Sequence, residues 1–443
     1  MMTRQNRSLY WVNFMFGSAW LILVALRSPD AVFLDEVAHV LMSRNAWQYP
    51  SFFLDTWGRP FNTLIYAIPA LGGMALSRWF SVGMALLVVW LTTLIAQKVG
   101  VKRLWIIPIA LFFQPWFAEM MFTANTMTPF ALLLIAGVYL WMIGRWKWAS
   151  LLFGLLPLTR HEGVALTVIW AGYCLIRRKP LASGVSFAPL GVYNLLYYLT
   201  YGMLASGNLF DAQPTTFYGA GGWFHYLPAV AHGVGVVLLL VGLLGIRPMF
   251  RHPLRVIFIP FMVYLVVHVV IYRYGLFASG GYRFFLVPTA PAFAILAGVG
   301  IERFMMGVHF RQRNFMWTLG GIVIVLYAVL TTFTHPLSPR TQALEQASAW
   351  MKANEADATE VLSGHVWFVY FYDLAWSPQL TDGWVRTGIQ LDQLAPETIV
   401  VWEGHFSERF GIAYDRLTES DEWQVLQEFG EGTHLVVLFK KDL

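Results

Sequence analysis

The sequence predicts a polytopic α-helical membrane protein that ends in a small α/β domain outside the membrane. Hydrophobic residues make up 57% of the 443 residues and charged residues only 12%, against about 45–50% and about 25% in soluble globular proteins. The charge is also divided along the chain: residues 1–338 carry a net charge of +15 and residues 339–443 a net charge of −10. We therefore expect a membrane domain over 1–338 and a water-soluble domain over 339–443.

Short basic clusters between the apolar runs predict the topology, because Lys and Arg gather in cytoplasmic loops. The six clusters are Arg4/Arg7, Lys98/Lys102/Arg103, Arg145/Lys147, Arg177/Arg178/Lys179, Arg247/Arg251/Arg255 and Arg303/Arg311/Arg313. The chain must leave and return between consecutive clusters, which predicts about eleven transmembrane helices. The N-terminus then lies in the cytoplasm. The C-terminal domain lies in the periplasm or outside the cell, on the outer face of a plasma (inner) membrane.

The high pI of about 9.2 does not indicate a nucleic-acid partner, because the basic residues follow the loops instead of forming one stripe. Leu9–Leu26 predicts a first span that stays uncleaved, since it is long for a signal peptide. The next apolar run, Phe61–Ala75, contains prolines and a glycine pair and has no basic cluster after it. We expect it to lie on or dip into the outer surface, with the second span starting near Arg78.

Two apolar runs, Trp148–Leu158 and Val164–Ile176, are each shorter than the roughly 20 residues of an ordinary span. Either Arg160–Gly163 forms the tip of a short helical hairpin within the membrane, or one basic cluster is misplaced. In the tail, the apolar spacing predicts a helix over Thr341–Asn354. Short strands are predicted at Thr359–Leu362, Thr398–Trp402, Gln424–Glu428 and His434–Phe439.

Acidic residues gather on the predicted outer side. Seven of the eight in the membrane part, including Asp211, fall there, and the long first outer loop, residues 27–78, holds four of them. Charges at a membrane boundary are costly and point to function, although solvation of an outer loop is the simpler alternative. The adjacent pair Asp35–Glu36 ends the first span, and His39 follows one helical turn later. Such a pair suits a general base and a supporting carboxylate.

Three arginines also reach the outer boundary: Arg59, Arg160 and Arg283. A leaving phosphate needs cations to stabilise its charge, so these residues are candidates for binding a lipid phosphate. Each arginine also has a purely structural explanation. An arginine at a membrane boundary can extend its side chain to the interface, and Arg160 could simply neutralise Glu162. We place Asp55, His39, Glu162 and Tyr282 in the same candidate substrate-binding set.

The acidic pair after the first span resembles the pattern of the GT-C superfamily of membrane glycosyltransferases. Arg59-Pro60 in the first loop looks like the basic-Pro element of these enzymes, where Lys-Pro-Pro is usual, and Arg78 matches the Arg of the next span. The stretch 281–288, Gly-Tyr-Arg-Phe-Phe-Leu-Val-Pro, is similar to an element of the polyprenyl-phosphate-mannose-dependent mannosyltransferases. The plan also resembles protein O-mannosyltransferases and aminoarabinose transferases.

This resemblance implies a GT-C-like fold and an inverting transfer of one sugar, with mannose the first candidate, from a polyprenyl-phosphate donor on the outer face. The acceptor would be a hydroxyl of a lipid, glycan or protein. Asp35 would be the base, Glu36 its support, and Arg59 and Arg283 ligands of the donor phosphate. Arg160 joins them by our own inference from burial. No cofactor is implied, but some relatives use a divalent metal, so His39 or Glu119 stay open as ligands.

Other functions remain open from the sequence. A transporter or flippase for lipid-linked sugars would also carry charges in the membrane, but near the midplane. A polymerase or ligase that moves a whole glycan from a lipid diphosphate would share the outer arginines. A non-enzymatic scaffold would use its acidic domain to bind a partner.

Overall fold

The structure is a computed structural model. It describes residues 4–205, 219–251, 253–276, 280–306, 310–355, 358, 360–377, 391, 394–409 and 412–442. Asp211 and Thr359, which figure in the predictions above, lie outside these residues. The chain forms two compact units, and each combines distant segments. The first contains residues 1–26, 54–62 and 75–334; the second contains 27–53, 63–74 and 335–443.

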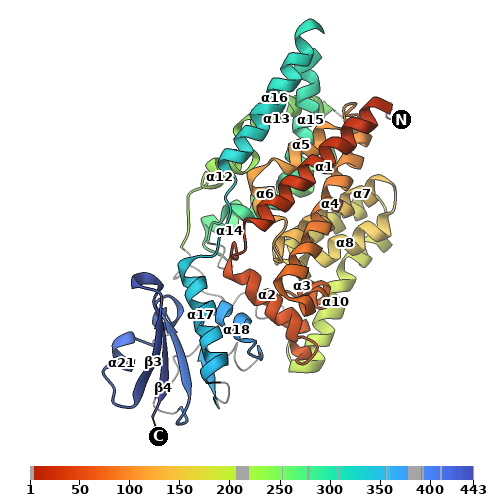
Figure 1. Cartoon of the computed structure of the whole chain (residues 1–443). Coiled ribbons are helices and arrows are strands. Elements are labelled where there is room, and N and C mark those ends of the chain that lie inside the picture. The colour runs from red at the N-terminus through yellow and green to blue at the C-terminus, as the bar shows by residue number, and fades with distance from the viewer. Residues whose placement is uncertain are drawn as a thin grey trace. The chain divides into compact units, whose positions relative to one another are not determined.

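The first unit consists of helices (Figure 1). Its α-helices are α1 (Arg4–Leu26), α4 (Gly73–Val99), α5 (Ile106–Phe112), α6 (Pro115–Met120), α7 (Met127–Met142), α8 (Trp146–Thr159), α9 (Gly163–Ile176), α10 (Pro180–Tyr201), α12 (Tyr226–Val234), α13 (Val236–Arg251), α14 (Ile259–Arg273), α15 (Ala290–Met306) and α16 (Phe310–Thr331). Short 3-10 helices, η4 (Pro253–Phe258) and η5 (Arg283–Thr289), precede α14 and α15. The predicted helical class agrees with this architecture.

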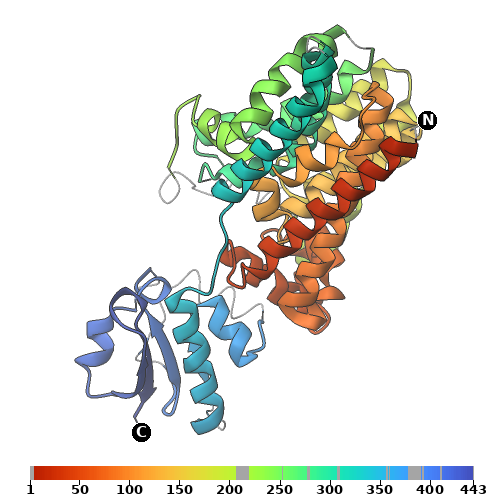
Figure 2. The ribbon, with the colours of Figure 1, turned by 45° about the horizontal axis from the view of Figure 1, so that its top comes forward.

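Among the described residues, four helical stretches are long and apolar enough to cross a membrane: Asn6–Leu26, Pro69–Val99, Arg255–Arg273 and Arg283–Met306. The bent pair α12 and α13 adds a fifth if it counts as one broken span. In Figure 2, α1 runs as one uninterrupted helix. The number of about eleven spans stays a prediction, because it also counts shorter apolar helices, such as Met127–Met142 and Gly163–Ile176.

The second span differs from its predicted start. We expected it near Arg78, but α4 already begins at Gly73. Gly73 has a φ of +70°, in the left-handed region that glycine enters without a steric cost. The chain can therefore turn from the preceding 3-10 helix, η2 (Pro69–Gly72), directly into α4.

Close helix packing in the first unit depends on small residues. A Cβ atom built on Gly300 of α15 would lie 1.9 Å from the carbonyl oxygen of Val241 in α13, and one on Gly245 would lie 2.2 Å from that of Leu296. The two helices thus approach backbone to backbone, as membrane helices do at glycines. At the start of α5, the Glu302 carboxylate of α15 accepts hydrogen bonds from the amides of Lys102 (2.7 Å) and Arg103 (2.6 Å).

The second unit joins an α/β layer to segments of the first outer loop. Its elements are α2 (Leu34–Asn45), η1 (Pro50–Leu54), α3 (Pro60–Tyr66, shared with the first unit), η2, α17 (Pro339–Asn354), β1 (Val361–Ser363), α18 (Val366–Tyr372), β2 (Ile399–Glu403), α20 (Phe406–Arg409), α21 (Tyr414–Thr418), β3 (Trp423–Phe429), η7 (Gly432–His434) and β4 (Val436–Lys441). The predicted tail helix and the four predicted strands are present, with ends shifted by a few residues.

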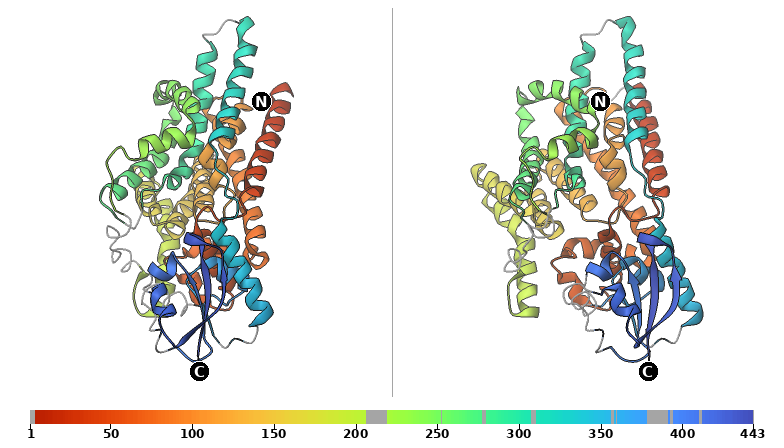
Figure 3. Two further views of the ribbon diagram at one scale, coloured as in Figure 1. Left: turned by 60° about the vertical axis from the view of Figure 1, so that its left-hand side comes forward. Right: turned by 90° about the vertical axis from the view of Figure 1, so that its left-hand side faces the viewer.

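The strands form one sheet in the order β1-β2-β4-β3. β1 and β2 are parallel, and the other two pairs are antiparallel. Figures 2 and 3 show α17 along this sheet, where it buries Leu344, Ala347 and Met351. On the sheet lies a second apolar cluster that includes Trp402, Leu417 and Phe439. The central strands β2 and β4 are accordingly almost completely buried.

Asp30 ties the first outer loop to the tail. Its buried carboxylate accepts hydrogen bonds from the Ser338 amide (2.9 Å), the Thr341 hydroxyl (2.9 Å) and the Trp367 indole (2.9 Å). The first two donors belong to the N-terminal turn of α17, where a carboxylate is favoured by the unpaired amides and the helix dipole. This outer carboxylate therefore has a structural role.

Candidate active site

The acidic pair opens α2, in the second unit. Asp35 and Glu36 occupy the first turn of the helix, where negative charge is favoured by the helix dipole. The two side chains differ in environment: Asp35 is exposed, whereas Glu36 is completely buried. His39, one turn further, is also buried, at 7% exposure. Of the three, only Asp35 is presented to solvent, as a base acting on an external hydroxyl requires.

Arg59 is held by a tight turn in the first unit. The Asp55 carboxylate accepts a hydrogen bond from the Gly58 amide, and Arg59 Nη1 donates to the Thr56 carbonyl oxygen at 2.8 Å. The φ angle of Arg59 is +63°, a left-handed conformation that costs a non-glycine residue on the order of 1–3 kcal/mol. Pro60 then starts α3. Such a conformation persists only when its surroundings impose it, and it occurs preferentially at ligand sites.

Arg160 and Glu162 form a buried ion pair at the tip between α8 and α9. Arg160 Nη2 lies 2.7 Å from Glu162 Oε1, and Arg160 Nε lies 3.2 Å from Oε2. The third guanidinium nitrogen, Nη1, donates to the Thr126 hydroxyl at 3.0 Å. The guanidinium also stacks 4.4 Å from the centre of the Phe285 ring in η5. This fork-to-fork geometry is the strongest form of the Arg–carboxylate pair, and it agrees with the predicted helical hairpin.

Two histidines surround the Glu162 carboxylate. His268 Nε2 lies 3.6 Å from Oε1, and His161 Nε2 lies 3.9 Å from it. His268 is completely buried in α14 and stacks on Phe285 with ring centroids 5.7 Å apart. His268 is not among the site residues predicted from the sequence, although a histidine inside an apolar span is itself a signal of function.

Arg283 lies at the start of η5 in a second cluster. Its Nη2 is 3.3 Å from Glu119 Oε2, and its Nη1 is 3.0 Å from His232 Nδ1. The other Glu119 oxygen accepts the Phe333 amide at 2.9 Å. Tyr282, the preceding residue, is 42% exposed. η5 therefore connects the two clusters, because it carries both Arg283 and the Phe285 ring that covers Arg160.

The three predicted arginines differ in how far they are neutralised. Arg160 and Arg283 each have a carboxylate partner, Glu162 and Glu119. Arg59 has none: within the described residues, its single hydrogen bond goes to the Thr56 carbonyl. Burial, followed by the positive charge of Arg160, lowers the pKa of Arg59, while the more weakly acting carboxylates of Glu162 and Asp55 raise it. An anion bound near these two guanidinium groups would offset the repulsion between them.

Comparisons with known proteins were made for the whole chain. No protein-family model matches it, and no curated protein sequence matches it. Solved structures do match in fold. ArnT from Cupriavidus metallidurans bound to undecaprenyl phosphate is 12% identical with a TM-score of 0.64, and the match covers 97% of each chain. ArnT from the same organism in the apo state is also 12% identical over 97% of each chain, with a TM-score of 0.66.

These matches show that the chain shares the fold of ArnT, which confirms the predicted helical fold class with its small C-terminal sheet. The roles of the site residues, the sidedness of the termini and the division into domains at residues 338/339 stay predictions. Among the described residues, no group of three or more His, Cys, Asp or Glu side chains is arranged to hold a metal ion.

Proposed function

We propose that the protein is an inverting glycosyltransferase that moves one sugar from a polyprenyl-phosphate donor to an acceptor hydroxyl at the outer face of the membrane. The observation that carries the proposal is the Arg59–Arg160 arrangement: among the described residues the Arg59 guanidinium forms no ion pair, and it lies within electrostatic range of Arg160. A lipid phosphate has the charge that such a group attracts. The fold match to a protein solved with undecaprenyl phosphate supports this ligand class.

In this proposal Asp35 accepts the proton of the acceptor hydroxyl as its oxygen attacks the anomeric carbon of the sugar. A new bond forms between the acceptor oxygen and the anomeric carbon, and the bond from that carbon to the phosphate oxygen breaks. The electron pair leaves with the polyprenyl phosphate. Arg59, with Arg160 beside it, stabilises the charge that develops on the phosphate. Inversion follows because attack and departure take place on opposite faces of the sugar.

The remaining predicted residues have supporting roles. Glu162 holds the Arg160 guanidinium in plane by its two hydrogen bonds. Arg283, paired with Glu119, supplies a third cationic group for the donor, and Asp55 shapes the turn that presents Arg59. Glu36 supports Asp35, while His39 and Tyr282 complete the substrate-binding set. The alternative of a divalent metal stays open.

The sugar is the finer part of the proposal. Mannose is the first candidate, from the resemblance of residues 281–288 to mannosyltransferases. Aminoarabinose is the second, since ArnT is a GT-C aminoarabinose transferase. The acceptor is a lipid, a glycan or a protein.

The test compares purified wild-type protein with Asp35→Asn. Each is incubated with a panel of polyprenyl-phosphate sugars and a crude lipid and glycan extract, and release of polyprenyl phosphate is measured by mass spectrometry. Loss of a general base lowers the rate by about 10²–10⁴-fold. Asp421→Asn, the same change at an exposed position of the soluble region, is the matched control. Equal release by Asp35→Asn and wild type would remove Asp35 from the mechanism. Absence of release across the whole panel would favour a transporter.

A further inference from the structure

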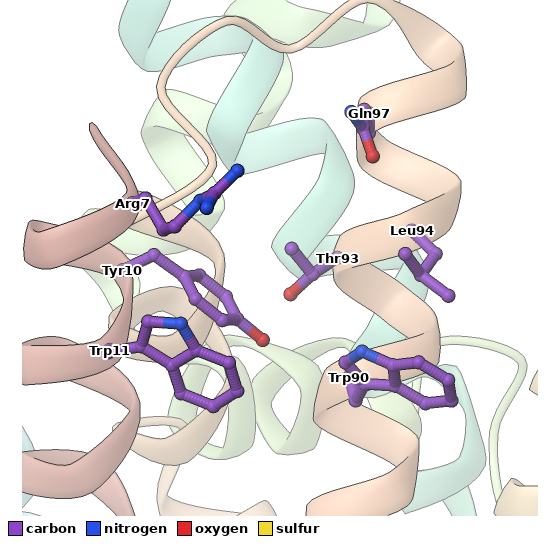
Figure 4. A pocket seen from close by; sticks show the side chains of 7 residues that line it. All are labelled: Arg7, Tyr10, Trp11, Trp90, Thr93, Leu94 and Gln97. Atoms are coloured by element: carbon purple, nitrogen blue, oxygen red, sulfur yellow. The ribbon is translucent and has the colours of Figure 1, made fainter. Parts of the chain in front are cut away.

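A groove lies between α1 and α4, outside the two arginine clusters. It has a volume of about 310 Å³. Figure 4 shows the seven residues that line it: Arg7, Tyr10, Trp11, Trp90, Thr93, Leu94 and Gln97. The first three lie near the start of α1, and the other four near the end of α4. Because both helices belong to stretches long and apolar enough to cross a membrane, the groove lies at the membrane surface where α1 begins and α4 ends.

The lining is polar at one end and apolar at the other. In Figure 4, Arg7 and Gln97 lie at the end nearer the helix termini, and the indole rings of Trp11 and Trp90 lie at the opposite end. Trp90 and Gln97 are seven positions apart, which is about 10 Å along a helix axis. The indole rings are half-exposed, at 51% and 46%, and Trp is typical of the membrane–water interface. The gradient thus follows the direction from headgroup to hydrocarbon.

The charge of the groove is also defined. Arg7 is the single charged residue among the seven that line it, so the lining carries one positive charge and no negative one. Gln97 adds an exposed side-chain amide beside it, whereas the buried Thr93 hydroxyl already donates to the Val89 carbonyl oxygen at 2.9 Å. A ligand that matches this set needs one anionic group, further oxygen atoms close to it, and a hydrocarbon part.

We propose that this groove binds an anionic glycerophospholipid, such as phosphatidylglycerol, from the adjacent membrane leaflet. Arg7 pairs with the lipid phosphate, the Gln97 amide bonds to glycerol and ester oxygens, and the two indole rings contact the first carbons of the acyl chains. A polyprenyl phosphate fits less well, because hydrocarbon follows its phosphate directly and offers no glycerol or ester oxygen to Gln97. The site is independent of the proposed transferase function.

The test is native mass spectrometry of the full chain in detergent. Delipidated protein is titrated with phosphatidylglycerol, phosphatidylcholine of the same acyl chains, undecaprenyl phosphate or glycerol 3-phosphate. We expect phosphatidylglycerol to bind most tightly and Arg7→Gln to weaken it by about tenfold or more. Arg247→Gln removes the same charge at an exposed position of α13 and should leave the affinity unchanged.

The following results would overturn the proposal. Arg7→Gln could bind the lipid like wild type, or Arg247→Gln could weaken it equally, in which case the attraction is a general effect of positive charge. Tighter binding of undecaprenyl phosphate would assign the groove to the polyprenyl lipid, and equal binding of glycerol 3-phosphate would assign it to a soluble anion. If Arg7→Gln unfolds at a lower temperature than wild type, Gln97→Leu is used in its place, because it keeps every charge. Unchanged lipid affinity in Gln97→Leu would equally contradict the proposal.

Discussion

At the scale of single residues, Arg59 differs from Arg160 and Arg283 because, among the described residues, it forms no ion pair with a carboxylate. We predict that Arg59→Gln raises the KM for the polyprenyl-phosphate donor by about 10–100-fold, the value of one hydrogen-bonded charge. Arg59→Lys should recover only part of this loss, because an ammonium keeps the charge but cannot bind a phosphate in two-point fashion. The measurement is initial rate against donor concentration.

The matched control for this prediction is Arg177→Gln, which removes an exposed arginine between α9 and α10. It should change neither KM nor kcat. An Arg59→Gln protein with normal KM would show that the strained turn serves folding and that the donor phosphate binds elsewhere.

A second residue-scale prediction concerns His365, which caps α18. It is buried, and its Nδ1 accepts the Trp367 amide at 3.3 Å. Burial, with smaller effects from Arg340 and His405, lowers the pKa of His365 to about 3. In the unfolded chain its pKa is about 6.5, so below that pH the unfolded state binds a proton that the folded state excludes. Stability is therefore lost as the pH falls from about 6.5 toward 3, by about 1.4 kcal/mol per unit.

His365→Asn tests this, because Asn keeps a capping acceptor at the start of the helix but does not titrate. We expect the thermal unfolding midpoint of the variant to fall less than that of the wild type between pH 7 and pH 5. Parallel decreases in the two proteins would mean that other groups carry the acid sensitivity.

The sequence allowed some of these residues to be predicted and concealed others. Asp35, Arg59 and Arg283 could be proposed because short motifs surround them. His268 could not be linked to Glu162, because the two lie more than a hundred residues apart and only folding brings them to 3.6 Å. The sequence also does not show which arginine has its charge neutralised. Nothing near Arg283 in the sequence distinguishes it from Arg59, because its partner Glu119 belongs to a distant helix.

At the scale of elements, the α8–α9 hairpin shows how a glycine permits a site. A Cβ atom on Gly163 would lie 2.3 Å from the carbonyl carbon of Leu156 and 2.6 Å from the nitrogen of Pro157. Both contacts are with backbone, so the helices would have to separate. We predict that Gly163→Ala destabilises the protein by about 1–3 kcal/mol and raises the donor KM, because the tip carries Arg160 and Glu162.

Gly172→Ala is the matched control in the same helix, since nothing lies within 4 Å of its added Cβ. It should be neutral or slightly stabilising, because alanine favours a helix over glycine by up to about 1 kcal/mol. The measurements are the thermal unfolding midpoint and the donor KM of the two variants. Similar behaviour of both would argue against a tightly closed tip.

Helices and strands were the most predictable elements, because their apolar periodicity is local. The hairpin was expected from two short apolar runs and agrees with α8 and α9. The start of α4 was misplaced because the sequence does not reveal that the glycine pair serves as a turn into the helix. The left-handed turn at Arg59 had no sequence signal either, since glycine or asparagine is the usual occupant of such a conformation.

At the scale of the whole molecule, the second compact unit combines parts of the chain that are far apart in sequence. Net charge predicts a domain boundary at residues 338/339, and that boundary stays a prediction. Yet the compact unit that contains the tail also includes residues 27–53 and 63–74. The reason lies in contacts across some 300 residues of sequence, such as Asp30 with Trp367 and the Met74 amide with the Tyr370 hydroxyl (3.0 Å).

The tail is therefore not expected to fold by itself. In a fragment of residues 335–443, the donors that Asp30 satisfies at the start of α17 and in α18 lose their acceptor, and Arg44 no longer pairs with Asp373 (3.1 Å). A hydrogen bond to a charged group contributes about 1.5–3 kcal/mol, and whole domains are stable by only about 5–15 kcal/mol. Losing several such bonds removes most of that margin.

We predict that this fragment lacks a cooperative urea transition, whereas the same fragment joined through a flexible Gly/Ser linker to residues 27–53 regains one. Circular dichroism across a urea series measures both. Asp30→Ala in the fusion is the internal control, because it keeps the added segment but removes the carboxylate, and it should lower the midpoint again. If the fragment alone unfolds cooperatively at the midpoint of the fusion, the tail is an independent domain. The outer-loop contacts would then join two already folded parts, instead of completing one.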